Sequence, residues 1–269
     1  MTLRVLVPSS VVREAEDKRE ATRKLGYVAR AATVFRADEL VVFPDPSGER
    51  GRGESFVTTV LEYATTPDYL RKGAFDVRDE LEFVGVLPPL RASWQTGSES
   101  TDSGSLRQGL VTDVGPDGRV RVTCGLQHPI SLVVPAELAV DEGERVPIRV
   151  SSRRPVRAKL VDEPLPGLVV RRSDLETVLG RTSGVTIAAS RYGQALTVAG
   201  LGNLAATLDD GATVVFGAPE RGLPAITGDE PGGDRDRFDR WVNAVPNQGS
   251  DVVRTEEAMF AVLACLNLR

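Results

Sequence analysis

The hydrophobic pattern of the chain changes its period twice, and this change limits the folds available to it. Residues 1–90 and 166–269 alternate short apolar runs with segments of helical spacing, which is typical of an α/β domain with a parallel sheet. Residues 91–165 instead show a period of two, with turn residues and no helical pattern between the apolar runs. The sequence therefore predicts an α/β domain interrupted by a small β-barrel.

The first α/β segment opens as a β-α-β unit with a long helix over 11–36. Arg19, Arg23 and Arg30 lie on the face of this helix opposite its apolar residues. A solvated face with ion pairs is as good an interpretation of these arginines as an RNA-binding face. Strands are predicted at 3–7 and 39–43, a further helix at 54–63, and a third strand at 81–87 that the Pro88-Pro89 pair ends.

The middle segment follows a connector at 92–105 that is rich in Ser, Thr, Gly and Asp. Five short strands in some sixty residues favour a barrel of the OB type. Its late strands are dense in cations, which indicates either an RNA-binding patch or a salt-bridged surface. The strands are expected at 108–114, 120–124, 130–134, 145–150 and 156–161, and the candidate RNA-binding residues are Arg149, Arg153, Arg154, Arg157 and Lys159.

The second α/β segment contains three loops of small and polar residues, Ser190–Gly193, Gly217–Gly222 and Val245–Gly249. Each follows an apolar run predicted to be a strand. Because ligands bind beyond the carboxyl ends of parallel strands, we expect these loops to form one pocket. Backbone donors and acceptors would dominate it, which suits a purine-containing cofactor. The last loop leads into a helix from Thr255 that is apolar nearly all round, so its own domain and a second subunit are both expected to cover it.

Composition excludes several classes of chemistry. His128 is the only histidine, and Cys124 and Cys265 stand far apart, so no histidine triad, metal site or disulfide framework is expected. The net charge of −5 argues against indiscriminate nucleic-acid binding. No apolar run is long enough for a membrane span and no secretory signal is recognised. We therefore predict a cytoplasmic protein.

A competing motif, Gly200-Leu-Gly202-Asn-Leu-Ala205, matches the dinucleotide-binding fingerprint. The acidic residue expected about 20 positions later is only approximately supplied by Glu220, inside a loop. A nicotinamide-dependent oxidoreductase is therefore the weaker interpretation.

Several of these segments together resemble the archaeal and eukaryotic SPOUT-class RNA methyltransferases that carry an inserted OB-like barrel. The resemblance implies a trefoil-knotted α/β fold, S-adenosyl-L-methionine bound in the knot, a homodimer formed through the knot, and ribosomal or transfer RNA as substrate. The segments are Gly26-Tyr-Val-Ala-Arg-Ala-Ala32, Asp38-Glu-Leu-Val-Val42, Thr66-Pro-Asp-Tyr-Leu-Arg-Lys72, Val84-Gly-Val-Leu-Pro-Pro-Leu-Arg91, Ala189-Ser-Arg-Tyr-Gly193, Val215-Phe-Gly-Ala-Pro-Glu-Arg-Gly-Leu223 and the run from Val245 to Ala258.

The resemblance also implies roles for individual residues. The main chain of Val245 and Gly249 would read the adenine edge. Apart from the resemblance, the guanidinium fork makes Arg254 and Arg30 the candidates for holding the acceptor nucleotide or its phosphate. Arg91, after the double proline, would contact the RNA or only anchor the connector. The cofactor site would be lined by Arg191, Gly193, Gly217, Pro219, Gly222, Asn243, Val245, Pro246, Gln248, Gly249 and Thr255.

A protein of a different class is kept as an alternative, namely a non-catalytic RNA-binding or ribosome-assembly factor with the same fold. Neither the RNA, nor the choice between base and ribose methylation, nor a general base follows from the residues.

Overall fold

The computed structural model describes residues 2–92, 104–233 and 237–268. The chain divides into two compact units, one formed by residues 1–64, 80–90 and 168–269 and the other by residues 65–79 and 91–167. Most of the predicted connector, residues 93–103, lies outside the described residues. No helix within the described ranges combines the length and hydropathy that a membrane span requires.

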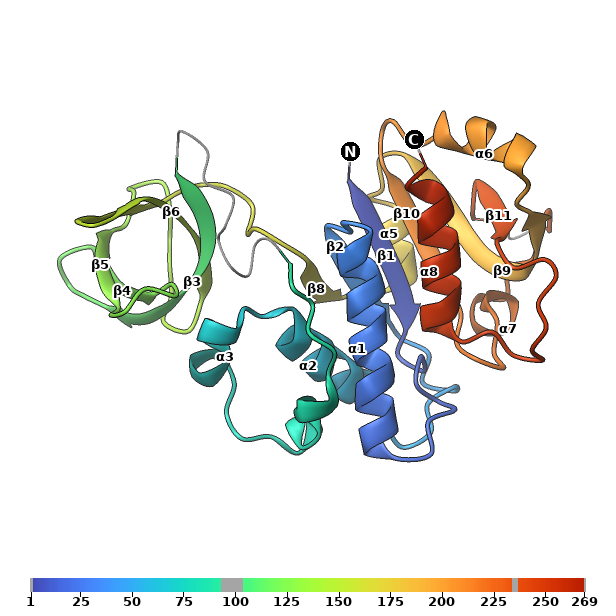
Figure 1. Cartoon of the computed structure of the whole chain (residues 1–269), viewed down its shortest axis with the longest axis horizontal. Coiled ribbons are helices and arrows are strands. Elements are labelled where there is room, and N and C mark those ends of the chain that lie inside the picture. The colour runs from blue at the N-terminus through green and yellow to red at the C-terminus, as the bar shows by residue number, and fades with distance from the viewer. Residues whose placement is uncertain (1, 93–103, 234–236, 269) are drawn as a thin grey trace. The chain divides into compact units, whose positions relative to one another are not determined.

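The first unit is built on a parallel sheet of six strands in the order β11-β9-β10-β1-β2-β8 (Figure 1). The mixed α/β architecture with a parallel sheet is confirmed. Strands β1 and β2 come before the barrel segment in the sequence. Strands β10 and β8 come after it, and they pair with β1 and β2, respectively. The strands are β1 (Leu3–Pro8), β2 (Glu39–Phe43), β8 (Val169–Arg172), β9 (Val185–Ala195), β10 (Ala212–Phe216) and β11 (Arg240–Asn243).

Helices cover both faces of this sheet. Helices α1 (Lys18–Val34) and α8 (Thr255–Leu266) pack side by side on one face (Figure 1). The other face contributes Leu6, Val41 and Phe43 to a core shared with the short helices that follow β8 and β10. Strands β1, β2 and β10 are accordingly buried along almost their whole length, as expected for parallel strands that helices cover on both faces. The remaining helices of the unit are α2 (Glu54–Thr65), α5 (Leu175–Leu179), α6 (Val198–Ala205) and α7 (Leu223–Thr227).

The predicted third strand at 81–87 is wrong. The segment instead forms two turns of 3-10 helix, Asp79–Leu81 and Val84–Val86. The sheet position beside β2 is taken by β8, which pairs with it from Glu39–Val169 to Val42–Arg172. The 3-10 segment packs on α1, where Gly26 leaves room for Pro88.

The second unit is a nearly closed antiparallel sheet of five strands in the order β5-β4-β3-β6-β7, whose edge strands β5 and β7 approach each other. Its interior is filled by apolar side chains that alternate along the strands, among them Val111, Val122 and Ile148. Helix α3 (Asp68–Ala74) belongs to the same unit. The strands are β3 (Ser105–Val114), β4 (Arg119–Thr123), β5 (Ile130–Val133), β6 (Arg145–Arg153) and β7 (Val156–Leu160).

Candidate functional site

A cavity of about 820 Å³ opens in the first unit beyond the carboxyl ends of β9, β10 and β11. All three predicted loops contribute to its wall, together with α7 and the first turns of α8. Of the residues predicted to bind the cofactor, the lining includes Arg191, Gly217, Gly222, Asn243, Val245, Gln248 and Thr255. Gly193, Pro219, Pro246 and Gly249 lie in the same loops but are not among the lining residues.

The first loop is a bulge inside β9 and not the end of a strand. The pairing of β9 with β11 jumps from Ala188–Trp241 to Gln194–Val242, so the intervening residues of β9 have no ladder partner on β11. A Cβ at Gly193 would lie 2.5 Å from the backbone nitrogen of Val242. Glycine is therefore needed there for close packing of the two strands.

The bulge presents an arginine and a tyrosine to the cavity. The Arg191 guanidinium lies 4.9 Å from the centroid of the Tyr192 ring and donates from Nη2 to its Oη at 2.8 Å. Tyr192 is 60% exposed although its ring is large and apolar. The pair gives the cavity a cation and an aromatic surface, the type of surface on which a nucleobase stacks.

The second loop is a tight turn from Gly217 to Gly222. Ala218 and Arg221 exchange two backbone hydrogen bonds of 3.0 and 3.1 Å across it. Glu220, at its tip, has a φ of 60°, a left-handed conformation that a non-glycine residue seldom adopts. A Cβ at Gly217 would meet the Leu223 nitrogen at 2.9 Å, so this glycine permits the turn to close on itself.

The third loop holds itself together by side-chain to backbone bonds. Asn243 donates from Nδ2 to the Arg191 carbonyl at 3.0 Å and accepts from the Val245 N–H at 2.9 Å, which joins the third loop to the first. Gln248 donates to the carbonyls of Ser250 and Asp251. The Val245 N–H would therefore have to break its hydrogen bond to Asn243 before it could donate to the edge of an adenine ring.

Helix α8 connects the third loop to the second. The Thr255 hydroxyl donates to the Gly217 carbonyl at 2.8 Å, and the Arg254 N–H donates to the Glu257 carboxylate at 2.9 Å, which caps the helix. The Arg254 side chain is exposed, between the cavity-lining residues Val253 and Thr255.

A bulge in β9 and the loops after β10 and β11 thus close one cavity in an α/β unit, and the two loops lie where the carboxyl-end rule predicts. A sequence model of the family described as "Putative RNA methyltransferase" matches residues 2–266. The chain belongs to this RNA methyltransferase family.

Relatives in the family cover almost the whole chain. An uncharacterized protein of Halobacterium salinarum is 63% identical over 281 residues, covering 100% of this chain and 99% of that protein. One from Haloarcula marismortui is 62% identical, with the same coverage. The human 28S rRNA (uridine-N(3))-methyltransferase is 28% identical over 307 residues, covering 98% of this chain and 77% of that protein.

The competing dinucleotide motif has the wrong geometry in this methyltransferase-family chain. Gly200 and Gly202 lie within helix α6, which the Thr197 hydroxyl caps by accepting from the Gly200 N–H. The fingerprint instead needs its glycines in the turn between a strand and a helix. The structure therefore does not support a nicotinamide site at this motif.

The cations predicted on the first unit lie apart from the cavity lining. Arg19 and Arg23 are exposed on α1. Arg30 donates to the backbone carbonyl of Leu90, with a second contact of 3.4 Å to that of Pro89. It therefore anchors the segment after the double proline, and its predicted role at the acceptor nucleotide stays a prediction.

Three of the predicted cations of the second unit line a separate hollow of about 1000 Å³, namely Arg149, Arg157 and Lys159, together with residues such as Ser131 and Ser151. Arg149 is paired with Glu163 at 2.5 and 2.6 Å, whereas Arg157 and Lys159 are exposed. Arg91 and Arg154 are also exposed. Arg153 is the last residue of β6.

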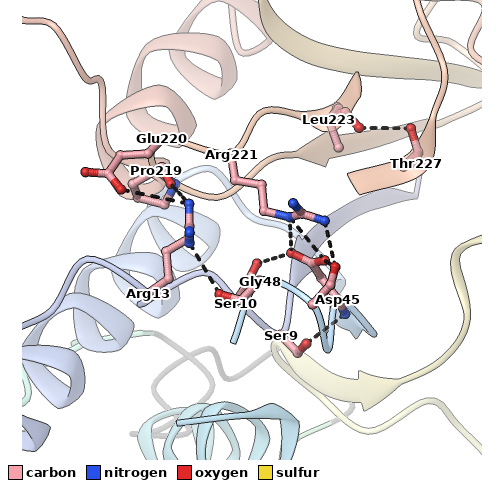
Figure 2. A network of polar contacts seen from close by, with 11 residues as sticks. Ser9, Ser10, Arg13, Asp45, Gly48, Pro219, Glu220, Arg221, Leu223 and Thr227 are labelled. Atoms are coloured by element: carbon pink, nitrogen blue, oxygen red, sulfur yellow. Dashed lines mark hydrogen bonds and ion pairs between the residues drawn. The ribbon is translucent and has the colours of Figure 1, made fainter. Parts of the chain in front are cut away.

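A polar network that the sequence motifs did not predict lies behind the second loop (Figure 2). Asp45, beyond β2, accepts hydrogen bonds from Ser10 and Arg221, and Arg13 donates to the Pro219 carbonyl. Of these five residues, only Pro219 and Arg221 lay within a motif considered for the site. The available signal was that Ser10 and Asp45 also follow strands of the parallel sheet, β1 and β2.

Proposed function

We propose that this chain is an S-adenosyl-L-methionine-dependent methyltransferase that modifies N3 of a uridine in ribosomal RNA. The observation that carries the proposal is the convergence of three distant loops on one cavity in a chain of an RNA methyltransferase family. The names of the human and mouse relatives support the choice of uridine N3 and of ribosomal RNA.

The cavity suits an adenosine-bearing ligand. Its volume of about 820 Å³ lies within the range of small-molecule sites, and its wall consists largely of turns that offer backbone groups. Gly222 lines it, and a Cβ added there would have only Pro224 near, at 3.7 Å. We assign the binding of S-adenosyl-L-methionine to the cofactor residues predicted above. When bound, it supplies an electrophilic methyl group, and the protein contributes binding and orientation.

The arginines around the cavity would hold and polarise the acceptor. Arg254, exposed beside the cavity, would bind a phosphate of the RNA through its guanidinium fork. Uridine carries a proton at N3; when the methyl group is attached, this proton would pass to a solvent water molecule and S-adenosylhomocysteine would leave. Arg191 would stabilise the negative charge that develops on the ring, while Tyr192 would stack on it. Arginine stays protonated, so neither arginine is assigned as the base.

The finer fold assignment is also part of the proposal. A SPOUT-class trefoil knot is supported by the return of the last helix α8 to pack against α1 and to bond the Gly217 turn. An OB-type barrel is supported by the order β5-β4-β3-β6-β7. Tyr27 and Val34, seven residues apart on α1 and 44% and 45% exposed, support a homodimer through the α1 and α8 layer. Sedimentation of the purified chain would test the dimer.

A deletion strain tests the proposed reaction directly. Nucleosides from its ribosomal RNA would be compared by mass spectrometry with those of the parent strain and of a strain complemented with the intact gene. We expect loss of one N3-methyluridine and its return on complementation. An unchanged profile would favour the alternative of a non-catalytic RNA-binding or assembly factor.

A further inference from the structure

The turn from Gly217 to Gly222 forms part of the cavity wall, and its outer side is held by residues from the first β-α-β unit. Arg221 extends away from the turn toward the loops that follow β1 and β2 (Figure 2). Its Nε lies 3.0 and 3.3 Å from the two carboxylate oxygens of Asp45, and its Nη2 donates to Ser47 at 2.7 Å. The turn is thereby tied to a segment 176 residues away in sequence.

Asp45 is the centre of this network. Its side chain is 3% exposed. Besides Arg221, its carboxylate accepts from the Ser10 hydroxyl at 2.6 Å and from the Ser47 hydroxyl at 3.2 Å, and its backbone N–H donates to Ser9 at 2.8 Å. A carboxylate with this many donors has one strongly preferred orientation. It can therefore fix the position of Arg221.

A second interaction holds the tip of the same turn. Arg13 donates from Nη1 to the Pro219 carbonyl at 3.3 Å and lies 3.9 Å from the Glu220 carboxylate. Both interactions act on the part of the turn that contains the left-handed residue Glu220. A backbone in a disfavoured conformation persists only where its surroundings enforce it.

We infer that Asp45 is a positioning residue for the methyl-donor cavity, acting through Arg221 to hold the Gly217–Gly222 turn in the shape that the ligand requires. Arg221 is among the residues that line the cavity and Asp45 is not, so the effect of Asp45 is indirect. The inference rests on the proposed function, because it assigns the cavity to S-adenosyl-L-methionine. It predicts that removal of the Asp45–Arg221 pair weakens donor binding and leaves RNA affinity unchanged.

The test is a calorimetric titration with S-adenosylhomocysteine of the wild type, Asp45→Asn, Arg221→Gln and the double variant. We expect each single variant to bind about tenfold more weakly, which corresponds to about 1.4 kcal/mol. We expect the double variant to bind no more weakly than the singles, because both act through one ion pair. RNA affinity, measured in parallel, should stay within about twofold of the wild type.

Glu39→Gln is the matched control. Glu39 starts strand β2, at the end opposite Asp45, and is also paired with arginines, Arg4 at 2.9 Å and Arg171 at 2.8 Å. We expect its donor affinity to equal that of the wild type. Should Asp45→Asn fail to fold, Ser10→Ala carries the same test, because Ser10 donates to the Asp45 carboxylate at 2.6 Å and, unlike Arg221, does not line the cavity.

The outcomes separate the two proposals. Absence of binding by the wild type would overturn the proposed function, and the inference with it. Normal binding by the wild type and by both single variants would overturn the inference alone. Additive losses of affinity in the double variant would also contradict it, because Asp45 would then not act through Arg221.

Discussion

Gly217 and Gly222 bound the same turn but face different surroundings. A Cβ at Gly217 would meet backbone atoms at 2.9 and 3.0 Å, whereas one at Gly222, which lines the cavity, would have only Pro224 near it, at 3.7 Å. We expect Gly217→Ala to lower the free energy of unfolding by about 1–3 kcal/mol, because the backbone must shift. Gly222→Ala should leave stability within about 0.5 kcal/mol and weaken binding of S-adenosylhomocysteine. Urea denaturation and calorimetry would measure both effects, and intact binding by Gly222→Ala would contradict the assignment.

Glu256 gives a pH-dependent prediction. Burial raises the pKa of its carboxyl above the usual 4.5, Glu14 adds to the effect and Lys24 opposes it. The folded chain therefore holds this proton to a higher pH than the unfolded chain does. As pH rises from 4.5 through the raised pKa, the free energy of unfolding falls. Glu256→Gln should therefore be more stable than the wild type at neutral pH, with a difference that shrinks below pH 4.5. Urea denaturation across this pH range would show it, and a difference that grew toward acid pH would contradict it.

At the scale of elements, the half-buried Tyr69 of helix α3 forms a hydrogen bond with the barrel. The Tyr69 hydroxyl donates to the Gln108 carbonyl at 3.0 Å, and burial raises the pKa of Tyr69 to about 12. We expect Tyr69→Phe to cost about 1 kcal/mol of unfolding free energy. The wild type should lose this stabilisation as pH rises from 10 through 12, since only the protonated phenol can donate. In an alkaline absorbance titration, the variant should lack a step near pH 12; an unchanged titration would contradict the burial of Tyr69.

The exposed cations of the barrel hollow are predicted to contribute to RNA affinity. Arg157 and Lys159 are exposed, whereas Arg149 is neutralised by Glu163. We expect Arg157→Gln with Lys159→Gln to weaken RNA binding and to reduce the slope of log affinity against log salt by about 1 for each phosphate that is no longer neutralised. Arg149→Gln is the comparison variant and should have a smaller effect. Equal effects of the two changes, measured by fluorescence anisotropy, would contradict a role for the exposed cations.

Local sequence patterns were sufficient to predict some of the helices and strands but not others. The barrel strands and the helix from Thr255 were predicted nearly to their ends because period and turn residues are local signals. Residues 81–87 were misassigned because an apolar run does not reveal whether a sheet position is free, and β8 occupies the place beside β2. Ser190–Gly193 was interpreted as a loop after a strand, although Gly193 packs against Val242 as a bulge within β9.

At the scale of the whole molecule, the cavity and its support come from different halves of the chain. The motifs of the second half predicted the three converging loops because the carboxyl ends of parallel strands meet at one edge. The contribution of the first half was not predicted. It depends on long-range pairing, in which β1 lies between β10 and β2 and brings Ser10 and Asp45 behind the Gly217–Gly222 turn.

The cavity of the first unit is proposed to deliver a methyl group to RNA. The most direct measurement incubates the purified chain with ribosomal RNA from a deletion strain and S-adenosyl-L-methionine labelled in its methyl group, followed by digestion to nucleosides and mass spectrometry. We predict label in N3-methyluridine and none when the protein is omitted. Absence of label from every nucleoside, with a folded protein that binds the RNA, would contradict the account.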